Sequence, residues 1–174
     1  MKLVVGLGNP GADYLWTRHN LGFIALDFWA ITLDAKWADR PKWQSVVAEA
    51  HVGGEKLLLI KPQAFYNKSG EVLQQIAAFY KVAKSDIVVV CDDFDLPYGQ
   101  VRYRASGSGG GNNGLSSVVA HMGEDIKRVR IGTDSALRQQ MGDADFVLSR
   151  LTDAEKAELP ALLPQVIEKI TENL

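Results

Sequence analysis

Cysteine is almost absent from this chain of 174 residues, which contains only Cys91. A single thiol excludes an internal disulfide and a metal site built on several cysteines. Because Cys91 directly follows the apolar run from Ile87 to Val90, we expect a small, buried strand residue at this position. The scarcity of cysteine therefore favours the reducing environment of the cytoplasm.

Long apolar runs are also lacking. No apolar stretch reaches the roughly 18 to 20 residues that a membrane-spanning helix needs. The chain begins directly with a strand-like segment and does not show the layout of a signal peptide. These features predict a cytoplasmic protein that has no membrane partner.

The sequence has no strong excess of charge of either sign. Its formal net charge is −2, so attraction of the whole molecule to nucleic acid is not indicated. The charges are uneven, however, because residues 100–138 contain six basic and three acidic side chains, whereas residues 143–174 contain three basic and seven acidic ones. The basic segment is either a local face that contacts phosphate or an ordinary solvated surface.

Apolar segments with strand character alternate with segments of helical periodicity along the chain. The predicted strands are residues 2–7, 45–52, 56–61, 86–91, 100–104 and 127–132. The predicted helices are residues 20–33, 69–80 and 114–122, followed by a C-terminal helical region that starts at the capping box of Thr152 and Glu155 and is interrupted near Pro160 and Pro164. This alternation predicts a single α/β domain over residues 1–174. A hairpin over residues 46–61, turning at Gly53 and Gly54, makes its central β-sheet mixed and flanked by helices.

Two glycine-rich segments follow predicted strands. The first, "GLGNPG" (residues 6–11), satisfies the pattern G-x-G-x-x-G, but no helix is predicted to begin inside it, and Asp27 lies in a helical pattern rather than at the end of a second strand. Dinucleotide binding is therefore disfavoured, and the loop is either a structural turn or a means of presenting Asn9. The second, "SGSGGGNNGL" (residues 106–115), lacks the G-K-[ST] of a phosphate-binding loop and places Asn112 and Asn113 where a helix begins.

Amide and carboxylate side chains follow three of the predicted strands. They are Asn9, Asn67 in "KPQAFYNKSG", and the pair Asp92 and Asp93, with Asn113 and His19 completing the set. In α/β proteins, sites form outside the carboxyl ends of the strands, so we expect these groups to gather at one edge of the sheet. Neutral amides can donate hydrogen bonds to a carbonyl oxygen on which negative charge develops.

His19 is the strongest candidate for a catalytic base. An unperturbed imidazole titrates at about pH 6.5 and can accept a proton at neutral pH. A carboxylate such as Asp92 could bond to its other nitrogen and hold one tautomer. The chain has neither the G-x-S-x-G of a serine hydrolase nor an H-E-x-x-H zinc motif. The residues alone leave two interpretations open, a His–Asp pair that activates water and a structural histidine.

Five blocks of sequence, in their order and spacing, carry a resemblance to a known family. They are "VVGLGNPGADYLWTRHNLGF" (4–23), "KPQAFYNKSG" (61–70), "DDFDLPYGQVRYR" (92–104), "GSGGGNNGLSSV" (107–118) and "RVRIG" (128–132). Together they resemble the bacterial-type peptidyl-tRNA hydrolases over nearly the whole chain. The resemblance implies an enzyme that cleaves the ester between a peptide and the 3′-terminal ribose of tRNA. It further implies action as a monomer on peptidyl-tRNA, with no metal or organic cofactor.

The resemblance also implies roles for the residues at matched positions. His19 would be the base for water, and Asp92 would orient and polarise it. Asn9 would position substrate or water, while Asn67 and Asn113 would bind the peptide and the terminal nucleotide. The glycines of the first loop would then serve to deliver Asn9.

Other matched positions are expected to contact the substrate. Arg102, Arg104 and Arg130 would bind RNA phosphates, for which an arginine fork is suited, although ordinary exposed arginines are the alternative. Tyr14 and Tyr66 would lie against the peptide or the terminal adenosine, or would simply pack.

Two positions depart from the family pattern. Tyr66 stands where the family usually has Met, and Asn112 stands where it usually has His. Both flank matched site residues, so turnover or specificity is expected to differ from that of family members with the usual residues. The departures also motivate a second hypothesis, a relative that binds RNA without hydrolysing it. A third hypothesis, a nucleotide-dependent oxidoreductase, would require dinucleotide binding, which we do not expect.

Overall fold

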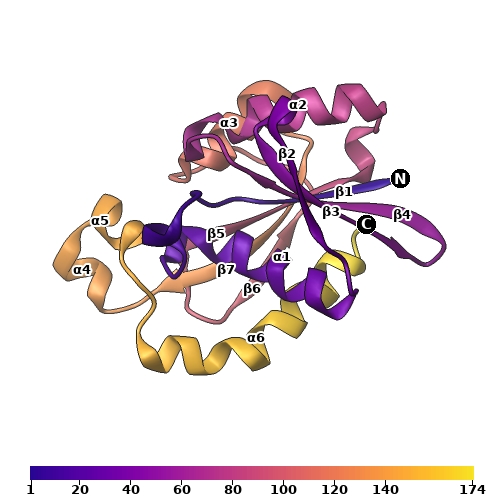
Figure 1. Ribbon diagram of the computed structural model, residues 1–174. Helices are drawn as coiled ribbons and strands as arrows, with labels where there is room; N and C mark the ends of the chain where they lie inside the picture. Colours follow the sequence, from indigo (N-terminus) through magenta and orange to yellow (C-terminus); the bar gives the residue numbers. More distant parts are fainter.

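A seven-stranded mixed β-sheet forms the centre of the computed structural model, which describes all residues from Met1 to Leu174 (Figure 1). In spatial order the strands are β2 (Trp37–Arg40), β3 (Ser45–Val52), β4 (Glu55–Pro62), β1 (Lys2–Gly6), β5 (Ile87–Pro97), β7 (Lys127–Asp134) and β6 (Val101–Arg104). β1 pairs in parallel with β4 and β5, and β5 pairs in parallel with β7. The remaining pairs are antiparallel. The α/β class and the mixed sheet predicted from the sequence are confirmed.

The central strands are apolar without alternation because both faces of the sheet are covered. Along β1, Leu3 and Val5 enter one core and Val4 enters the other. Cys91 on β5 is buried in the first of these cores, as predicted. Successive side chains of a strand point to opposite faces, so a continuous apolar run supplies both cores at once.

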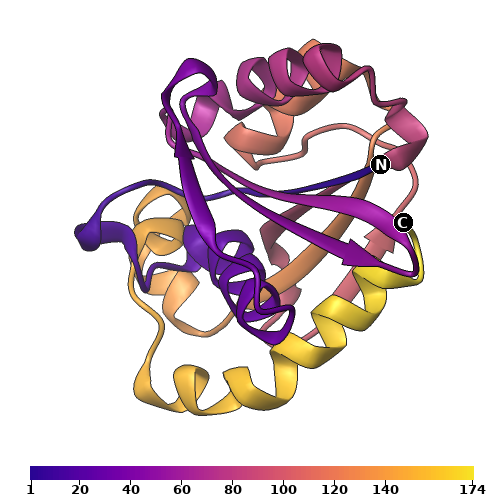
Figure 2. The ribbon, with the colours of Figure 1, turned by 45° about the vertical axis from the view of Figure 1, so that its right-hand side comes forward.

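Helices cover the two faces of the sheet in pairs. α2 (Ser69–Tyr80) and α3 (Asn113–Met122) lie on one face, and α1 (Leu21–Thr32) and α6 (Asp153–Thr171) lie on the other (Figures 1 and 2). α2 and α3 approach so closely at Gly70 that any side chain there would overlap the Ser117 carbonyl. None of the helices combines the length and the apolar character required to cross a bilayer.

The C-terminal helix differs from the expectation of an interrupted region. Its predicted capping box is present, since Thr152 and Glu155 bond reciprocally. The helix nevertheless continues through Pro160 and Pro164 to Thr171. Both prolines lie on the exposed face, where water can bond the carbonyls that lose an N–H partner, while the opposite face is anchored in the core. Tertiary packing therefore overrides the local signal.

Several elements were not predicted. β2 is a four-residue edge strand with two charged side chains, and α4 (Leu137–Met141) and α5 (Asp143–Leu148) are too short to show a clear period. β5 was predicted to end at Cys91, but it continues to Pro97 because its pairing with β7 persists beyond that point. Conversely, the β3–β4 hairpin was predicted correctly, and its two turn glycines have φ of 59° and 82°.

Short 3-10 turns occupy the carboxyl edge of the parallel strands. η1 (Ala12–Tyr14) and η2 (Arg18–Asn20) lie between β1 and α1, and η4 (Tyr66–Lys68) lies between β4 and α2. No α-helix starts within the glycine loop after β1, as expected. Two further turns, η3 (Pro41–Trp43) and η5 (Lys84–Asp86), lie elsewhere in the chain. The edge formed by η2, η4, β5 and the start of α3 brings the candidate residues together.

Candidate active site

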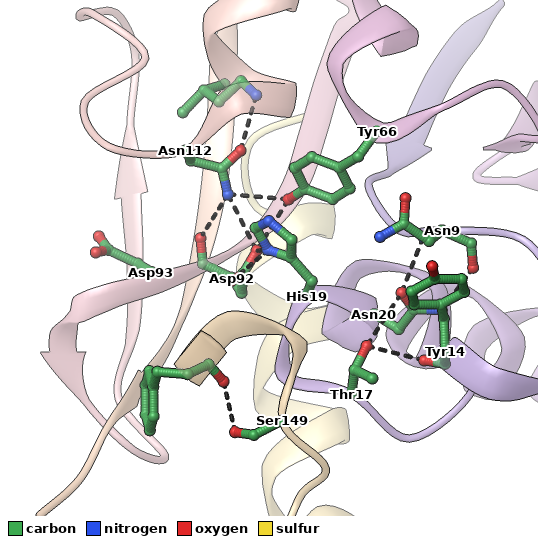
Figure 3. A network of polar contacts seen from close by, with 12 residues as sticks. Asn9, Tyr14, Thr17, His19, Asn20, Tyr66, Asp92, Asp93, Asn112 and Ser149 are labelled. Carbon is green, nitrogen blue, oxygen red and sulfur yellow. Dashed lines mark hydrogen bonds and ion pairs between the residues drawn. The ribbon is translucent and has the colours of Figure 1, made fainter. Parts of the chain in front are cut away.

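His19 and Asp92 form a direct pair. Nδ1 of His19 lies 2.9 Å from both carboxylate oxygens of Asp92 (Figure 3). His19 comes from η2 and is 8% exposed, whereas Asp92 comes from β5 and is 1% exposed. Because an ionised carboxylate only accepts hydrogen bonds, this contact places the imidazole proton on Nδ1. Nε2 is then the nitrogen available to accept a proton.

Tyr66 contacts both members of this pair. Its ring stacks on the imidazole of His19, with centroids 3.9 Å apart and planes inclined by 16°. Its hydroxyl donates to Oδ1 of Asp92 at 2.9 Å. The sequence predicted a substrate contact at Tyr66, and the structure shows that its hydroxyl is turned inward to the carboxylate (Figure 3).

Asn112 completes the surroundings of Asp92. Its Nδ2 donates to Oδ1 of Asp92 at 3.0 Å and to the Tyr66 hydroxyl at 2.9 Å. Its Oδ1 accepts from the backbone N–H of Leu115 at 2.8 Å and so caps α3, at the helix start predicted from the sequence. Tyr66 and Asn112, the two positions that depart from the family pattern, are therefore hydrogen-bonded to each other and to the same carboxylate.

An open cleft of about 650 Å³ lies in front of His19. Ten residues line it, among them most of the predicted set: Asn9, His19, Phe65, Tyr66, Asn67, Lys68, Asn113, Ala144, Val147 and Leu148. The side-chain amides of Asn9, Asn67 and Asn113 make no hydrogen bond within the protein and can donate to a ligand in the cleft. One wall is apolar and comes from α5, which the sequence did not predict.

The loop that carries Asn9 is fixed by Asn20. Oδ1 of Asn20 accepts from the backbone N–H of Asn9, and its Nδ2 donates to the Asn9 carbonyl, both at 2.9 Å. Close packing of Gly8 against the ring of Phe23 leaves no room for a Cβ at this point of the loop. The loop therefore has a defined shape that leaves the Asn9 side chain free toward the cleft.

Burial raises the pKa values of two weak acids beside the His19–Asp92 pair. Burial and the charge of Asp92 raise the pKa of the Tyr66 phenol well above its usual value, so its hydroxyl remains a donor. The same two causes raise the pKa of the Cys91 thiol. Because the thiolate is the reactive form, Cys91 is not activated as a nucleophile.

A buried ion pair supports the turn that carries His19. Arg18 is fully buried, and its Nη2 donates to both oxygens of Glu155 at 2.9 and 2.7 Å. Its Nη1 donates to the Ser149 hydroxyl and the Arg150 carbonyl, each at 2.7 Å. η2 is thereby joined to the start of α6, an interaction between residues too far apart in the sequence to be predicted.

The predicted arginines lie on one face of the β6–β7 pair, away from the cleft lining. Arg102 and Arg104 are exposed on the edge strand, and Arg102 lies directly opposite Arg130. Arg130 is partly neutralised, because its Nη1 lies 3.2 Å from Oδ2 of Asp93. Tyr14 is exposed on η1 and is not part of the cleft wall. No group of three or more His, Cys, Asp or Glu side chains is arranged to hold a metal ion.

Sequence comparisons relate this chain to known proteins. The sequence model of the family described as Peptidyl-tRNA hydrolase matches residues 3–174. The peptidyl-tRNA hydrolase of Desulfitobacterium hafniense (strain Y51) is 47% identical over 174 residues, covering 98% of this chain and 91% of the relative. The peptidyl-tRNA hydrolase of Mycobacterium tuberculosis (strain ATCC 25618 / H37Rv) is 44% identical over 167 residues, covering 95% and 87%.

Solved structures give the same result. The crystal structure of peptidyl-tRNA hydrolase from Acinetobacter baumannii matches with a TM-score of 0.90 at 29% identity, covering 99% of this chain and 88% of that one. A peptidyl-tRNA hydrolase in complex with N-propanol matches with a TM-score of 0.86 at 30% identity, covering 94% and 83%. With the sequence matches over nearly its full length, this shows that the chain belongs to the peptidyl-tRNA hydrolase family.

Proposed function

We propose that this protein hydrolyses the ester between a peptide and the 3′-terminal ribose of tRNA, with His19 as the base for the attacking water. The observation that carries the proposal is the His19–Asp92 pair on the wall of a cleft that also presents three unpaired side-chain amides. A base, an orienting carboxylate and neutral donors are the parts that water-mediated ester cleavage requires.

The reaction follows from these positions. Nε2 of His19 takes a proton from water as the water oxygen attacks the ester carbonyl, and Asp92 stabilises the imidazolium that forms. Amides of Asn9, Asn67 or Asn113 donate to the oxygen on which negative charge develops. When the C–O bond breaks, the ribose oxygen takes the proton from His19, which leaves an intact tRNA and a peptide carboxylic acid that releases its remaining proton to solvent. No covalent enzyme intermediate is required.

The composition of the cleft is suited to both parts of this substrate. Phe65 is 76% exposed and lies with Val147 and Leu148 on the cleft wall, where apolar peptide side chains or the terminal base can pack. Lys68 lies on the same wall and makes no ion pair in the structure, so its ammonium is free for a phosphate. The cleft thus combines stacking surface, amide donors and one cation.

Basic residues on the β6–β7 pair are proposed to bind the RNA backbone. Arg102 and Arg104 are exposed and have no acidic partner, whereas Asp93 competes for Arg130. We therefore expect Arg102 and Arg104 to contribute more to binding than Arg130. Each phosphate contact that is lost should lower the salt dependence of tRNA affinity, by about one unit of logarithmic slope or less. Equal salt slopes for the wild type and Arg102→Ala/Arg104→Ala would contradict this assignment.

The test of the function uses purified protein and a model peptidyl-tRNA with a labelled peptide. We expect release of free peptide and recovery of intact tRNA. Binding of tRNA without release of peptide at any pH from about 6 to 9 would instead support the non-catalytic RNA-binding hypothesis. Because the substrate arises in translation, we propose that the protein acts in the cytoplasm, as a single-domain monomer, to return tRNA for reuse.

A further inference from the structure

We propose that Tyr66 and Asn112 act as one positioning pair, which holds the carboxylate of Asp92 in place for its hydrogen bond with His19. The inference deepens the proposed function and rests on it, because it assigns roles to two residues behind the proposed base. Neither role follows from the His19–Asp92 contact itself, which uses only the carboxylate and the imidazole.

The Tyr66 hydroxyl, Asn112 Nδ2 and Asp92 Oδ1 form a closed triangle of hydrogen bonds. The Tyr66 hydroxyl, Asn112 Nδ2 and His19 Nδ1 lie 2.9, 3.0 and 2.9 Å from Oδ1 of Asp92. Asn112 Nδ2 also donates to the Tyr66 hydroxyl at 2.9 Å. Each member of the pair therefore contacts both the carboxylate and the other member, so displacement of either one disturbs both contacts. Hydrogen bonds to an ionised acceptor are stronger than neutral ones, which makes this triangle an effective restraint.

The backbone of α3 determines which way the Asn112 amide faces. The N–H of Leu115 in the first turn needs an acceptor, and Oδ1 of Asn112 supplies it at 2.8 Å. The NH₂ group must then point toward Asp92. The start of the helix thus fixes a donor beside the carboxylate, and the reversed amide would lose the cap and place an oxygen against a carboxylate oxygen.

The Tyr66 ring is confined by two neighbours. One face stacks on His19, and a Cβ added at Gly114 would come within 2.5 Å of Cε1 of Tyr66, so the ring is packed against the backbone of α3. Tyr66 is 7% exposed, and burial raises the pKa of its phenol well above the usual value. The hydroxyl therefore donates to Asp92 throughout the neutral range, and the ring limits rotation of the imidazole.

Tyr66→Phe and Asn112→Ser separate this role from folding. Phenylalanine keeps the stacked ring and removes only the hydroxyl. Serine keeps the capping ability at the start of α3 but is too short to place a donor on Asp92. The matched control is Tyr98→Phe, which removes a hydroxyl that donates to the Glu155 backbone carbonyl at 2.6 Å and makes no hydrogen bond to His19, Asp92, Tyr66 or Asn112.

Hydrolysis of a model peptidyl-tRNA by the three single variants and the double variant gives the kinetic test. We expect Tyr66→Phe and Asn112→Ser each to lower kcat about tenfold, with KM changed less than about twofold, because only the orientation of the base is disturbed. The double variant should fall little further, since the two residues act as a unit. Tyr98→Phe should keep the wild-type kcat.

The inference is overturned if either single variant keeps kcat within about twofold of the wild type, or if the double variant falls by the product of the single effects, about a hundredfold. An equal loss in Tyr98→Phe would overturn it as well, because the effect would then reflect general loosening.

A readout independent of activity separates this inference from the proposed function. The proton on Nδ1 of His19 should give a protected NMR resonance in the wild type, assigned by its absence in His19→Ala. We expect the resonance to shift or broaden in Tyr66→Phe and Asn112→Ser and to stay unchanged in Tyr98→Phe. An unchanged resonance in both site variants would contradict the positioning role even in a protein that hydrolyses its substrate. A wild type without hydrolysis would refute the proposed function while leaving this test in place.

Discussion

Replacement of Glu155 by glutamine is predicted to destabilise the protein strongly. The carboxylate is the counter-charge of the fully buried Arg18, which donates to both of its oxygens. Glu155→Gln keeps the size of the side chain and one acceptor, but it removes the charge and turns an NH₂ group toward the guanidinium. It also weakens the capping box, in which Glu155 accepts from the Thr152 N–H at 2.7 Å.

The magnitude follows from the burial of the pair. Breaking a buried ion pair by removing one charge costs about 3–5 kcal/mol, and we take about 3 kcal/mol because one acceptor remains. For a chain of this length, about 1 kcal/mol corresponds to a shift in Tm of about 2–4 °C, so Tm should fall by about 6–12 °C. Because Arg18 precedes His19 on η2, activity measured near the transition should fall with it.

Urea denaturation followed by circular dichroism measures this effect. We expect the midpoint to fall while the denaturant dependence of the unfolding free energy stays the same. The control is Glu158→Gln, which makes the same substitution one turn further along α6 at an exposed residue without an ion pair. Equal midpoints for the two variants, or a loss under about 1 kcal/mol in Glu155→Gln, would refute the reasoning.

Three further predictions concern packing, a buried cation and alkaline pH. Gly114→Ala would force a Cβ against the Tyr66 ring and should cost about 1–3 kcal/mol of unfolding free energy together with activity; an unchanged urea midpoint would count against the packing. Arg128 donates five hydrogen bonds to backbone carbonyls of the second glycine-rich loop and the turn before β7, and a lysine cannot reach all of these acceptors. Arg128→Lys should therefore lower the unfolding free energy by about 2 kcal/mol or more in the same urea assay, whereas the exposed Arg102→Lys should leave it unchanged. Burial raises the pKa of Tyr98 to about 12 and also raises the pKa values of Tyr66 and Cys91, so the folded state keeps protons that the unfolded state has lost. Stability should therefore be full below about pH 8.5 and fall as the pH rises through about 10 toward 12, less steeply in Tyr98→Phe; a flat unfolding free energy over this range would contradict it.

The strongest local patterns were sufficient to predict much of the fold. The continuous apolar runs of β1 and β5 indicate strands covered on both faces, and the hairpin between β3 and β4 follows from two adjacent glycines. The two prolines of α6 misled the local prediction because the helix is anchored by its opposite face. β2 was missed because a short edge strand depends on its neighbour, β3, rather than on its own composition.

The chemical groups of the site were predictable, but their mutual support was not. His19, Asp92 and the three asparagines could be selected because imidazole, carboxylate and amide groups follow predicted strands or begin predicted helices. The inward turn of the Tyr66 hydroxyl depends on Asn112, which is 46 residues away in the sequence. The apolar cleft wall on α5 depends on a helix of six residues that shows no clear period.

The most direct test of the central claim is the single-turnover rate of peptide release from a model peptidyl-tRNA, measured with excess enzyme for the wild type and His19→Ala. tRNA binding is measured on the same preparations. If His19 is the base for water, the rate should fall by about 10²-fold or more while tRNA affinity stays within about threefold. A His19→Ala variant that binds tRNA normally and releases peptide within about threefold of the wild-type rate would contradict the account.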